Sequence, residues 1–455
     1  MKLMQNLNCC KSWGCDNFGR PDQADYDQLS HHLGYPALHC QKCGSYPPLI
    51  NNEAVHQLYL EKHPTHYLHP RLHCPRCFQA HAQNIQRYGV TSSGRQRFRC
   101  RTCQKVFTPP RMPELTKLQA ILQGIEQQQS PTRQMQRLGL NAKSYYQQLQ
   151  WLAILLSYFS RHLEHHHLPR TLLAMQSETG ILSLAGNIRL WCITTAEAKS
   201  GYQLLLNHNA STLSLEDGEY QGKEDNRLSA FTDQSLTEAI KKRYQQIMNR
   251  YHFEDIQYGP SACWKQAHLI QPWLISYAHF QILRDVSKLA QHQHHYLEQE
   301  SCIRGAAIMG AIEAIQERHA EVFYLFSHPD QQTAFWADGR PLGWWKDRWF
   351  STPFGGYCPI TERRHYRHPF QMRDIATNQH YFQYLSQHIP KMIKGLAPLN
   401  AHLLIQRCCY NFTVDGEQSP AERLGLPHYD HSIQALLNAA YQTDERHYAN
   451  DFETL

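Results

Sequence analysis

Residues 74–103 have the sequence CPRCFQAHAQNIQRYGVTSSGRQRFRCRTC, which begins and ends with a Cys-x-x-Cys pair. Cys74 pairs with Cys77, Cys100 pairs with Cys103, and 22 residues separate the two pairs. Each pair presents two thiolates from one tight turn, and two such turns complete a tetrahedral four-sulfur site for zinc. The residues between the pairs indicate a strand, a glycine turn and a basic strand. The stretch therefore predicts a zinc ribbon.

A second group of cysteines lies upstream. Cys40 and Cys43 form another Cys-x-x-Cys pair, and Cys10 and Cys15, with four residues between them, complete a second predicted zinc site. Cys9 is an alternative to Cys10. Nine of the 15 cysteines lie between residues 9 and 103, and in a chain without an export signal this clustering favours metal over disulfides. We therefore expect two structural zinc ions.

Three helices are predicted after the ribbon. Apolar residues recur at helical spacing over 114–129, Ser130-Pro131 starts a short second helix that Gly139 ends, and Asn141 caps a third. Short helices joined by a glycine-containing turn match the helix-turn-helix plan, whose second helix enters the major groove; an ordinary helical hairpin is the alternative. The candidate DNA contacts on this helix and on the ribbon are Asn141, Lys143, Ser144, Gln147, Arg95, Arg97 and Arg99.

Charge is distributed unevenly along the 455 residues, which are enough for about two to four domains. Hydrophobic residues make up 42% of the chain, which excludes a disordered protein. Residues 1–150 carry 18 Lys and Arg against 8 Asp and Glu, whereas the remainder carries 27 against 31. The basic N-terminal part favours double-stranded DNA as the partner, and a solubilising surface is the alternative.

No membrane association is expected. The longest apolar stretch, 151–159, is half of the roughly 20 residues that a membrane-spanning helix needs. The first residues lack the apolar core of a secretory signal. We expect a cytoplasmic protein.

The pattern changes to strands after Pro169. Residues 172–184, 189–195 and 202–207, joined by tight turns, predict an antiparallel meander. The elements predicted next alternate between helix and strand: helix 235–250, strand 253–258, helix 262–269 and strand 273–279. This order of elements is that of an RNase H-like domain.

The predicted fold class is multidomain α+β, with zinc ribbons and a helix-turn-helix followed by the RNase H-like domain. The predicted segments are a first zinc-binding module over 1–70, the zinc ribbon over 71–112, the helix-turn-helix with a connector over 113–168, and the RNase H-like domain over 169–455. An aromatic-rich insertion near 335–370 is expected to pack on the core, with base stacking as the alternative.

Several histidines and cysteines outside the zinc clusters are expected to be structural. His279 is predicted to be a hydrogen-bonded core residue at the end of a strand, and His292–His295 a polar linker. Cys408 and Cys409 lie in an apolar helical pattern and are expected to be core thiols, because no activating partner is evident.

The chain resembles the insertion-sequence transposases that join a zinc ribbon and a helix-turn-helix to an RNase H-like domain. The resemblance covers most of the chain and is most specific over 74–107. It is carried by Tyr88-Gly89, Gly94-Arg95-Gln96-Arg97-Phe98-Arg99-Cys100, Arg189-Leu190-Trp191, Arg407–Phe412 and Ser419-Pro420-Ala421. Such transposases act as dimers or larger assemblies, so the resemblance also implies a homo-oligomer.

The resemblance implies a site in which three carboxylates hold two magnesium ions. Glu178 stands on the first strand where an aspartate is usual, and no acid stands directly after the fourth predicted strand, where Asp255 lies a few residues early. Glu298 and Glu300 both suit the third position, and Glu313 lies further along. The implied triad is Glu178, Asp255 and Glu300, in degenerate form, with magnesium needed only by an active enzyme.

The leading interpretation is a zinc-dependent, sequence-specific double-stranded-DNA-binding protein of transposase ancestry that has lost catalysis. An active transposase performing metal-dependent strand transfer is the first alternative. An interaction scaffold for protein or RNA is the second. Salt dependence separates the scaffold from the DNA-binding readings, because counterion release makes DNA affinity fall steeply with salt.

Overall fold

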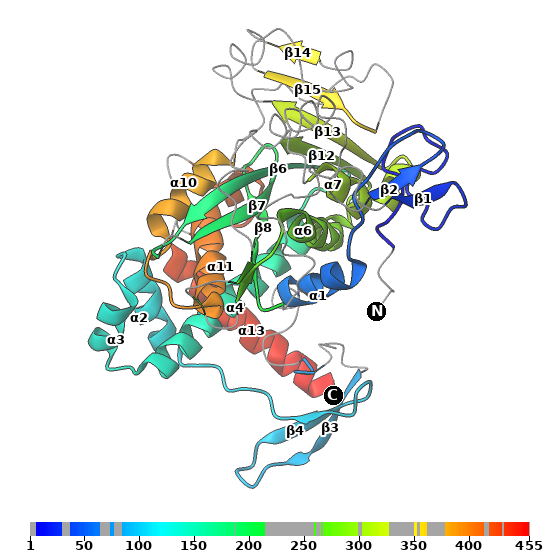
Figure 1. Ribbon diagram of the computed structural model, residues 1–455. Coiled ribbons are helices and arrows are strands. Elements are labelled where there is room, and N and C mark those ends of the chain that lie inside the picture. Colours follow the sequence, from blue (N-terminus) through cyan, green and yellow to red (C-terminus); the bar gives the residue numbers. More distant parts are fainter. Residues whose placement is uncertain are drawn as a thin grey trace. The chain divides into compact units, whose positions relative to one another are not determined.

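The computed structural model describes most of the chain. The described residues are 6–29, 37–63, 73–76, 84–186, 188–213, 259–260, 264, 267–298, 303–326, 350–352, 355–361, 378–413, 418–429 and 432–454. They form a mixed α+β structure with a mixed sheet, as the sequence predicts at this level (Figure 1). The chain divides into two compact units. Unit 1 consists of Met1–Glu61 and Pro169–Gln383, and unit 2 of Lys62–Leu168 and Tyr384–Leu455.

A mixed sheet of seven strands forms the centre of the described part of unit 1. Its order is β14-β15-β13-β12-β6-β7-β8 (Figure 1). The strands are β6 (Leu172–Ser183), β7 (Arg189–Glu197), β8 (Gln203–His208), β12 (His292–Glu298), β13 (Ala320–Phe326), β14 (Phe350–Thr352) and β15 (Gly355–Pro359). β6, β7 and β8 are antiparallel neighbours, as the predicted meander requires. β12 runs parallel to β6, β13 runs parallel to β12, and β15 and β14 add antiparallel strands at the edge.

The helix α6 (Pro272–Ser287) corrects the prediction of a strand over 273–279. Almost all of its residues are buried, so the apolar residues show no clear helical period in the sequence. Pro272 at the first helical position is the signal that favours a helix start. The predicted helix over 262–269 is also wrong at its described end, where His268–Leu269 is strand β11. Strand β11 forms a small sheet with β9 (Ala210–Ser211) and β10 (Gly259–Pro260). The predicted elements over 235–250 and 253–258 lie outside the described residues.

The expected polar linker His292–His295 is instead the first half of β12, a central strand. Of its side chains, Gln293, His294 and His295 are buried, and each has a partner. Gln293 Nε2 donates to the carbonyl of Ser287, His294 Nε2 lies 3.4 Å from Glu321, and His295 Nε2 lies 3.3 Å from Gln293 Oε1. Polar residues tolerate burial when they are hydrogen-bonded. The polar residues of this segment are therefore compatible with a core strand, although in the sequence they indicated a linker.

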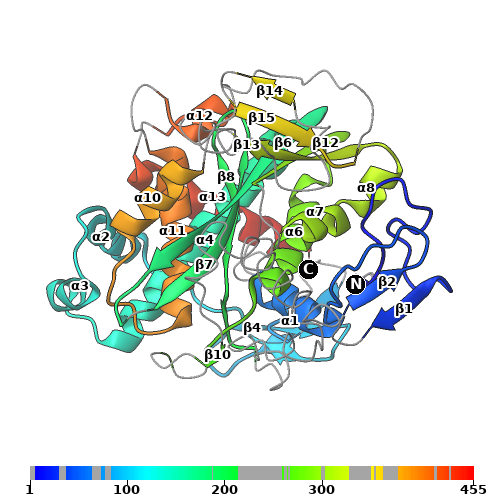
Figure 2. The same ribbon diagram turned by 45° about the horizontal axis from the view of Figure 1, so that its top comes forward.

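The first zinc-binding segment packs within unit 1. It contains β1 (Tyr26–Leu29), β2 (Ala37–Cys40) and α1 (Asn52–Lys62), and it lies beside α7 (Arg304–Gly310) and α8 (Ile312–Gln316) (Figure 2). A Cβ built on Gly19 would lie 2.5 Å from Cδ1 of Ile312, and Cys9 Sγ is 3.3 Å from Met309 Sδ. Glu61 accepts hydrogen bonds from Ser211 and Thr212. Residues 1–61 are thus grouped with the sheet rather than with the ribbon, whereas the finer predicted boundaries stay predictions.

Unit 2 contains the ribbon and most of the long helices. The ribbon strands are β3 (Ile85–Val90), β4 (Gln96–Cys100) and β5 (Val106–Phe107), and the helices are α2 (Leu115–Glu126), α3 (Pro131–Leu138), α4 (Ala142–His167), α11 (Leu396–Phe412), α12 (Pro420–Arg423) and α13 (Ile433–Thr454). A further helix, α10 (Gln379–His388), begins in unit 1 and ends in unit 2. The predicted third helix and connector are one continuous helix, α4, which packs on α11 and α13.

A buried charge cluster joins α4 to α11. Glu164 lies between Arg161 and Arg407, and Arg407 Nη1 donates to Glu164 Oε1 at 3.0 Å. Ser160 Oγ also donates to Glu164 and accepts from Arg407. Because buried charges are tolerated only when they are paired, this cluster fixes how the two helices pack. The expected core thiols Cys408 and Cys409 on α11 are buried, as predicted, and burial raises the pKa of Cys408 to about 11.

Candidate metal centres and helix-turn-helix

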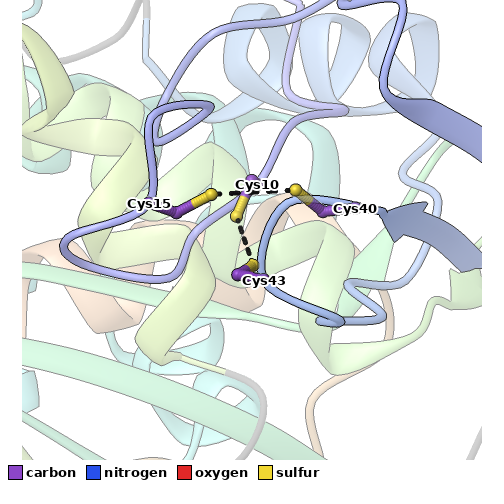
Figure 3. Close-up of side chains that lie close together, drawn as sticks. All are labelled: Cys10, Cys15, Cys40 and Cys43. Carbon is purple, nitrogen blue, oxygen red and sulfur yellow. Dashed lines mark hydrogen bonds between the residues drawn. The ribbon is translucent and has the colours of Figure 1, made fainter.

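The first cysteine cluster brings together Cys10, Cys15, Cys40 and Cys43, as predicted (Figure 3). Their four sulfur atoms all lie within 4.8 Å of one another. Cys10 Sγ is 3.5 Å from Cys43 Sγ, and Cys15 Sγ is 3.8 Å from Cys40 Sγ. A tetrahedral zinc with Zn–S bonds of about 2.3 Å has sulfur atoms about 3.8 Å apart. The cluster is therefore positioned to bind one metal ion.

Cys10, and not Cys9, belongs to this cluster. Cys9 Sγ points to Met309 Sδ of α7, and the side chain of Cys9 is fully buried. The sequence left the two neighbouring cysteines as alternatives. The two cysteines differ because Cys9 packs on Met309, 300 residues further along the chain. The spacing of neighbouring cysteines carries no information about such a contact.

The turns of Cys40–Cys43 and Cys100–Cys103 share one backbone conformation. The N–H of Gly44 donates to the carbonyl of Cys40 at 2.8 Å, and the N–H of Gln104 donates to the carbonyl of Cys100 at 2.9 Å. Gly44 and Gln104 have φ values of +68° and +61°, which fold the chain back after the second thiol. The two turns therefore present their thiols in the same way.

Polar groups surround the first cluster. The Nδ2 of Asn17 lies 3.5 Å from Cys40 Sγ, and the Oγ of Ser45 lies 3.2 Å from Cys43 Sγ. Burial alone would raise the pKa of Cys43, but hydrogen bonds with Ser45, Cys10 and Cys15 lower that pKa to about 6. Groups that hydrogen-bond to ligands orient them and stabilise the thiolate form that metals require.

The second cluster contains Cys74, Cys100 and Cys103. Cys74 Sγ is 3.4 Å from Cys103 Sγ, and Cys74 and Cys100 are fully buried. The fourth predicted ligand, Cys77, lies outside the described residues. Three thiols from opposite ends of the predicted ribbon thus converge on one point, as the spacing requires, and this cluster is also positioned to bind a metal ion.

The ribbon is a three-stranded antiparallel sheet of order β3-β4-β5. Phe98 and Ile85 form its small core. On the other side, the guanidinium groups of Arg97 and Arg99 lie over the ring of Tyr88, at 5.9 and 5.6 Å from its centroid. Arg95 is not part of this group, because its guanidinium donates to the carbonyl of Pro109. The sequence offered the arginines as DNA contacts but did not include Tyr88, which is 45% exposed, among them.

The helices α2, α3 and α4 begin at or within one residue of the predicted positions, and α3 ends before Gly139 as predicted, whereas α2 ends at Glu126, three residues before the predicted end at 129. The Oγ of Ser130 accepts from the N–H of Arg133 and so caps α3. Gly139 ends α3 with φ +62°, and the Oδ1 of Asn141 accepts from the N–H of Ser144 at 2.9 Å to cap α4. The turn between α3 and α4 is therefore three residues long and contains a left-handed glycine.

The candidate DNA contacts on α4 differ in their surroundings. Lys143 and Gln147 are exposed, and Ser144 is half-buried. Asn141 is exposed, but its side-chain oxygen is engaged as the helix cap. Lys143 and Gln147 are four residues apart and therefore lie on the same face of the helix.

Two of the candidate carboxylates, Glu178 and Glu298, lie in the central sheet of unit 1, and Glu313 lies on α8. Glu178 is on β6, where its carboxylate accepts from the side chain of Gln176 and, at 3.1 Å, from the backbone N–H of Asn378. Asp255 and Glu300 lie outside the described residues. Glu298, which the sequence also offered, ends β12 beside β6 and accepts from the N–H and the Oγ1 of Thr179, both at 2.9 Å. Burial raises the pKa of Glu298, against the lowering effect of these bonds.

Asn378 is a residue that the sequence did not suggest. Its side chain donates to the carbonyl of Gln176 and accepts from Gln203, so it ties the start of α10 to β6 and β8. An isolated asparagine before a helix carries no signal in one sequence. Its role depends on a contact across about 200 residues, between Asn378 and Glu178.

No protein-family model, no curated protein and no solved structure matches the chain. Within the described residues, no helix is long and apolar enough to cross a membrane.

Proposed function

We propose that this chain is a zinc-dependent, sequence-specific double-stranded-DNA-binding protein of insertion-sequence-transposase ancestry. In this proposal, unit 2 binds DNA and unit 1 is an RNase H-like domain that no longer catalyses strand transfer. The protein acts in the cytoplasm as a homo-oligomer. The observation that carries the proposal is the direct succession of a thiol-anchored ribbon and a capped helix-turn-helix within unit 2.

The helix-turn-helix supports DNA binding through its turn and its exposed residues. A recognition helix is held by the preceding short helix and presents its first turns to the major groove. Here the cap at Asn141 sets where α4 begins, and Lys143 and Gln147 occupy its first two turns. A lysine suits a phosphate or guanine, and a glutamine suits adenine.

The ribbon adds a second cationic surface. Arg97 and Arg99 flank an exposed tyrosine ring, and no carboxylate pairs with either arginine in the described part of the chain. Arginine over an aromatic ring keeps its charge available to a phosphate while the ring limits its motion. Zinc is the metal that best fits four thiolates at the observed sulfur spacing.

The sheet order of unit 1 supports the RNase H-like ancestry. Three antiparallel strands, β6, β7 and β8, are followed in sequence by β12 and β13, which join parallel to β6 on its other side. This is the strand arrangement that the resemblance implies, with β12 in the place of the predicted fourth strand.

The hydrogen bonds of the two described candidate carboxylates support loss of catalysis. A two-metal site needs carboxylate oxygens directed at shared ions. Glu178 is engaged by Gln176 and Asn378, and Glu298 by Thr179. Among the described residues, the groups positioned for a metal are the cysteine clusters, and neither contains Glu178 or Glu298. Magnesium has no part in the proposed function.

The decisive experiment exposes the purified zinc-loaded chain to fragmented genomic DNA of its host and sequences the retained fragments. We expect enrichment of defined sequences, with affinity falling by orders of magnitude between about 50 and 200 mM salt. Cys100→Ser should abolish binding because the ribbon loses its metal. Lys143→Ala with Gln147→Ala should remove sequence preference. No enrichment, or affinity that does not change with salt, would replace this proposal with an interaction scaffold.

Catalysis is tested on the retained fragments with magnesium. We expect no nicking by the wild-type chain. Nicking that Glu178→Gln abolishes would establish an active transposase instead.

A further inference from the structure

A cavity of about 420 Å³ lies within unit 2, outside the ribbon and the helix-turn-helix. Its apolar side consists of Phe159 and Leu163 of α4, Ala439 of α13 and Tyr429 of the segment before α13. The rings of Phe159 and Tyr429 meet edge to face, with centroids 5.8 Å apart. Cavities of roughly 300–1,000 Å³ with a mainly apolar lining are typical of small-molecule sites.

The polar side of the cavity is cationic or neutral. It consists of His162 of α4 with Thr443, Arg446 and His447 of α13. The described lining contains no aspartate or glutamate. The carboxylate of Glu164 on α4 is already paired with Arg161 and Arg407. The cavity therefore has a positive rim that no lining carboxylate neutralises.

Arg446 is available to a ligand. It is exposed, and its hydrogen bonds within the described residues are long ones to its own helix: Nε donates to the carbonyl of Gln442 at 3.3 Å and Nη2 donates to Thr443 Oγ1 at 3.4 Å. No carboxylate pairs with it in the described part of the chain. A guanidinium with this freedom can bind a carboxylate or phosphate with two parallel hydrogen bonds.

Two imidazoles, those of His162 and His447, line the polar side of the cavity. The Nδ1 of His447 lies 3.0 Å from the hydroxyl of Tyr158. When that hydroxyl donates to Nδ1, the proton of the neutral ring is on Nε2, which is then free to donate to an anion. The ring of His162 packs against those of His447 and His166, at 4.8 and 4.7 Å between centroids. Burial and these neighbouring histidines lower the pKa of His162 to about 4, so it is neutral at pH 7.

We propose that this cavity binds a small aromatic anion, in which a flat apolar ring carries one carboxylate or phosphate group. Arg446 and His447 hold the anion, and Phe159 and Tyr429 contact the ring. The inference does not depend on DNA binding, because it rests on the cavity and its charge alone.

The test is calorimetric titration of the full zinc-loaded chain with 1-naphthoate, with 1-naphthyl phosphate and with the neutral analogue 1-naphthamide. We expect one of the two anions to bind at a single site, and naphthamide to bind about tenfold more weakly or less. Failure of both anions to bind at up to about 5 mM would overturn the proposal, as would equal affinity for the anions and naphthamide.

Variants locate the site. Arg446→Gln should weaken the anion about tenfold or more and leave naphthamide unchanged, because it removes a charge but no ring contact. Ala439→Phe should fill the cavity and abolish binding of both. The matched control is Arg423→Gln, an exposed arginine outside the lining, which should bind as the wild type does. Unchanged anion affinity in both Arg446→Gln and Ala439→Phe, with zinc content and circular dichroism preserved, would overturn the proposal.

Discussion

Gly124 of α2 and Gln134 of α3 are in such close contact that a Cβ built on Gly124 would lie 2.6 Å from Cδ of Gln134. Gln134 has little room to move, because its side chain is buried and its Nε2 donates to the carbonyl of Gln129 at 3.0 Å. The absence of a side chain at position 124 thus allows α3 to approach α2. The helix that precedes the proposed recognition helix is held in place by this contact.

Gly124→Ala should therefore destabilise the protein. Alanine normally stabilises a helix interior by up to about 1 kcal/mol relative to glycine, but overpacking costs about 1–3 kcal/mol. We expect a net loss of about 1 kcal/mol in the free energy of unfolding, measured by urea titration. Adding Gln134→Ala should remove the clash and restore part of the loss. A Gly124→Ala protein that is more stable than the wild type would contradict the close packing.

The number of zinc ions bound per chain should show that the two cysteine clusters are independent metal sites. We expect two zinc ions per wild-type chain by elemental analysis, and one in Cys10→Ser or in Cys100→Ser, because each variant removes one ligand of a different four-thiolate site. Cys9→Ser is the matched control for Cys10→Ser and should keep both ions, since Cys9 contacts Met309. The opposite result for this pair would exchange the roles of the two cysteines.

Loss of metal from the first cluster should loosen unit 1. The turn at Gly19 packs on Ile312, and Lys11 donates to the carbonyls of Leu7 and Cys9 beside Tyr277. Structural zinc supplies the stability of the segments that it holds. In Cys10→Ser, amide hydrogen exchange should become faster in residues 6–29 and in α7 and α8, whereas the ribbon amides of 84–107 should be unchanged. Faster exchange confined to the ribbon would be the contrary outcome.

Removing the two arginines beside Tyr88 should reduce the salt dependence of the proposed DNA binding. Each lost phosphate contact lowers the slope of log affinity against log salt by about 0.9, so Arg97→Gln with Arg99→Gln should lower it by about 2. Fluorescence anisotropy on a retained DNA fragment measures the slope. Lys288→Gln, at an exposed position of unit 1, is the control and should leave the slope unchanged. An unchanged slope in the double variant would show that this face does not contact phosphate.

Acid should destabilise the fold from about pH 6.5 downward. Burial lowers the pKa of His279 to about 3 and that of His402 to about 4, and burial together with His294 lowers that of His295 to about 4. The pKa of each histidine is about 6.5 in the unfolded chain. Between that pH and the lower pKa of the folded chain, the unfolded chain binds protons that the folded chain does not, so the free energy of unfolding decreases as the pH is lowered. Each histidine contributes about 1.4 kcal/mol per pH unit in that range. Urea unfolding at pH 7.5, 6.5 and 5.5 measures the fall.

His402 provides the sharpest variant for this test. Neither of its ring nitrogens has a hydrogen-bond partner within the described residues, and the side chain is buried on α11. His402→Leu should therefore raise stability at pH 7 and reduce its fall with pH, because a buried polar group without a partner is unfavourable. His319→Leu, at an exposed position, should do neither. If the stability of the wild type and that of His402→Leu fell equally as the pH was lowered, the lowered pKa of His402 would be contradicted.

The features that the sequence predicted are those set by near neighbours. The cysteine turns depend on a spacing of three residues, and the helix-turn-helix depends on Ser130, Gly139 and Asn141, which act on their own helix ends. The meander β6-β7-β8 depends on apolar strands joined by short turns. These signals lie within a few residues of the element that they define.

The features that the sequence missed are set by distant contacts. Strand β12 was hidden because its histidines have partners only in the folded sheet. As a result, the sequence did not show that Glu298 ends a strand paired with β6, where its carboxylate accepts from Thr179. Among the described residues, Asn378 and Cys9 likewise acquire their roles from partners that lie 200 or more residues away.

The division of the chain has a consequence for inheritance. The polypeptide passes from one unit to the other after Glu61, after Leu168 and after Gln383, so each unit is assembled from two separate stretches of the gene. A premature stop codon after the helix-turn-helix would remove α11 and α13, on which α4 packs. No single recombination breakpoint separates the two units: a break after Gln383 keeps unit 1 together with 62–168 of unit 2, and a break after Glu61 keeps unit 2 together with most of unit 1. Neither unit can therefore be passed on by one such event without a fragment of the other.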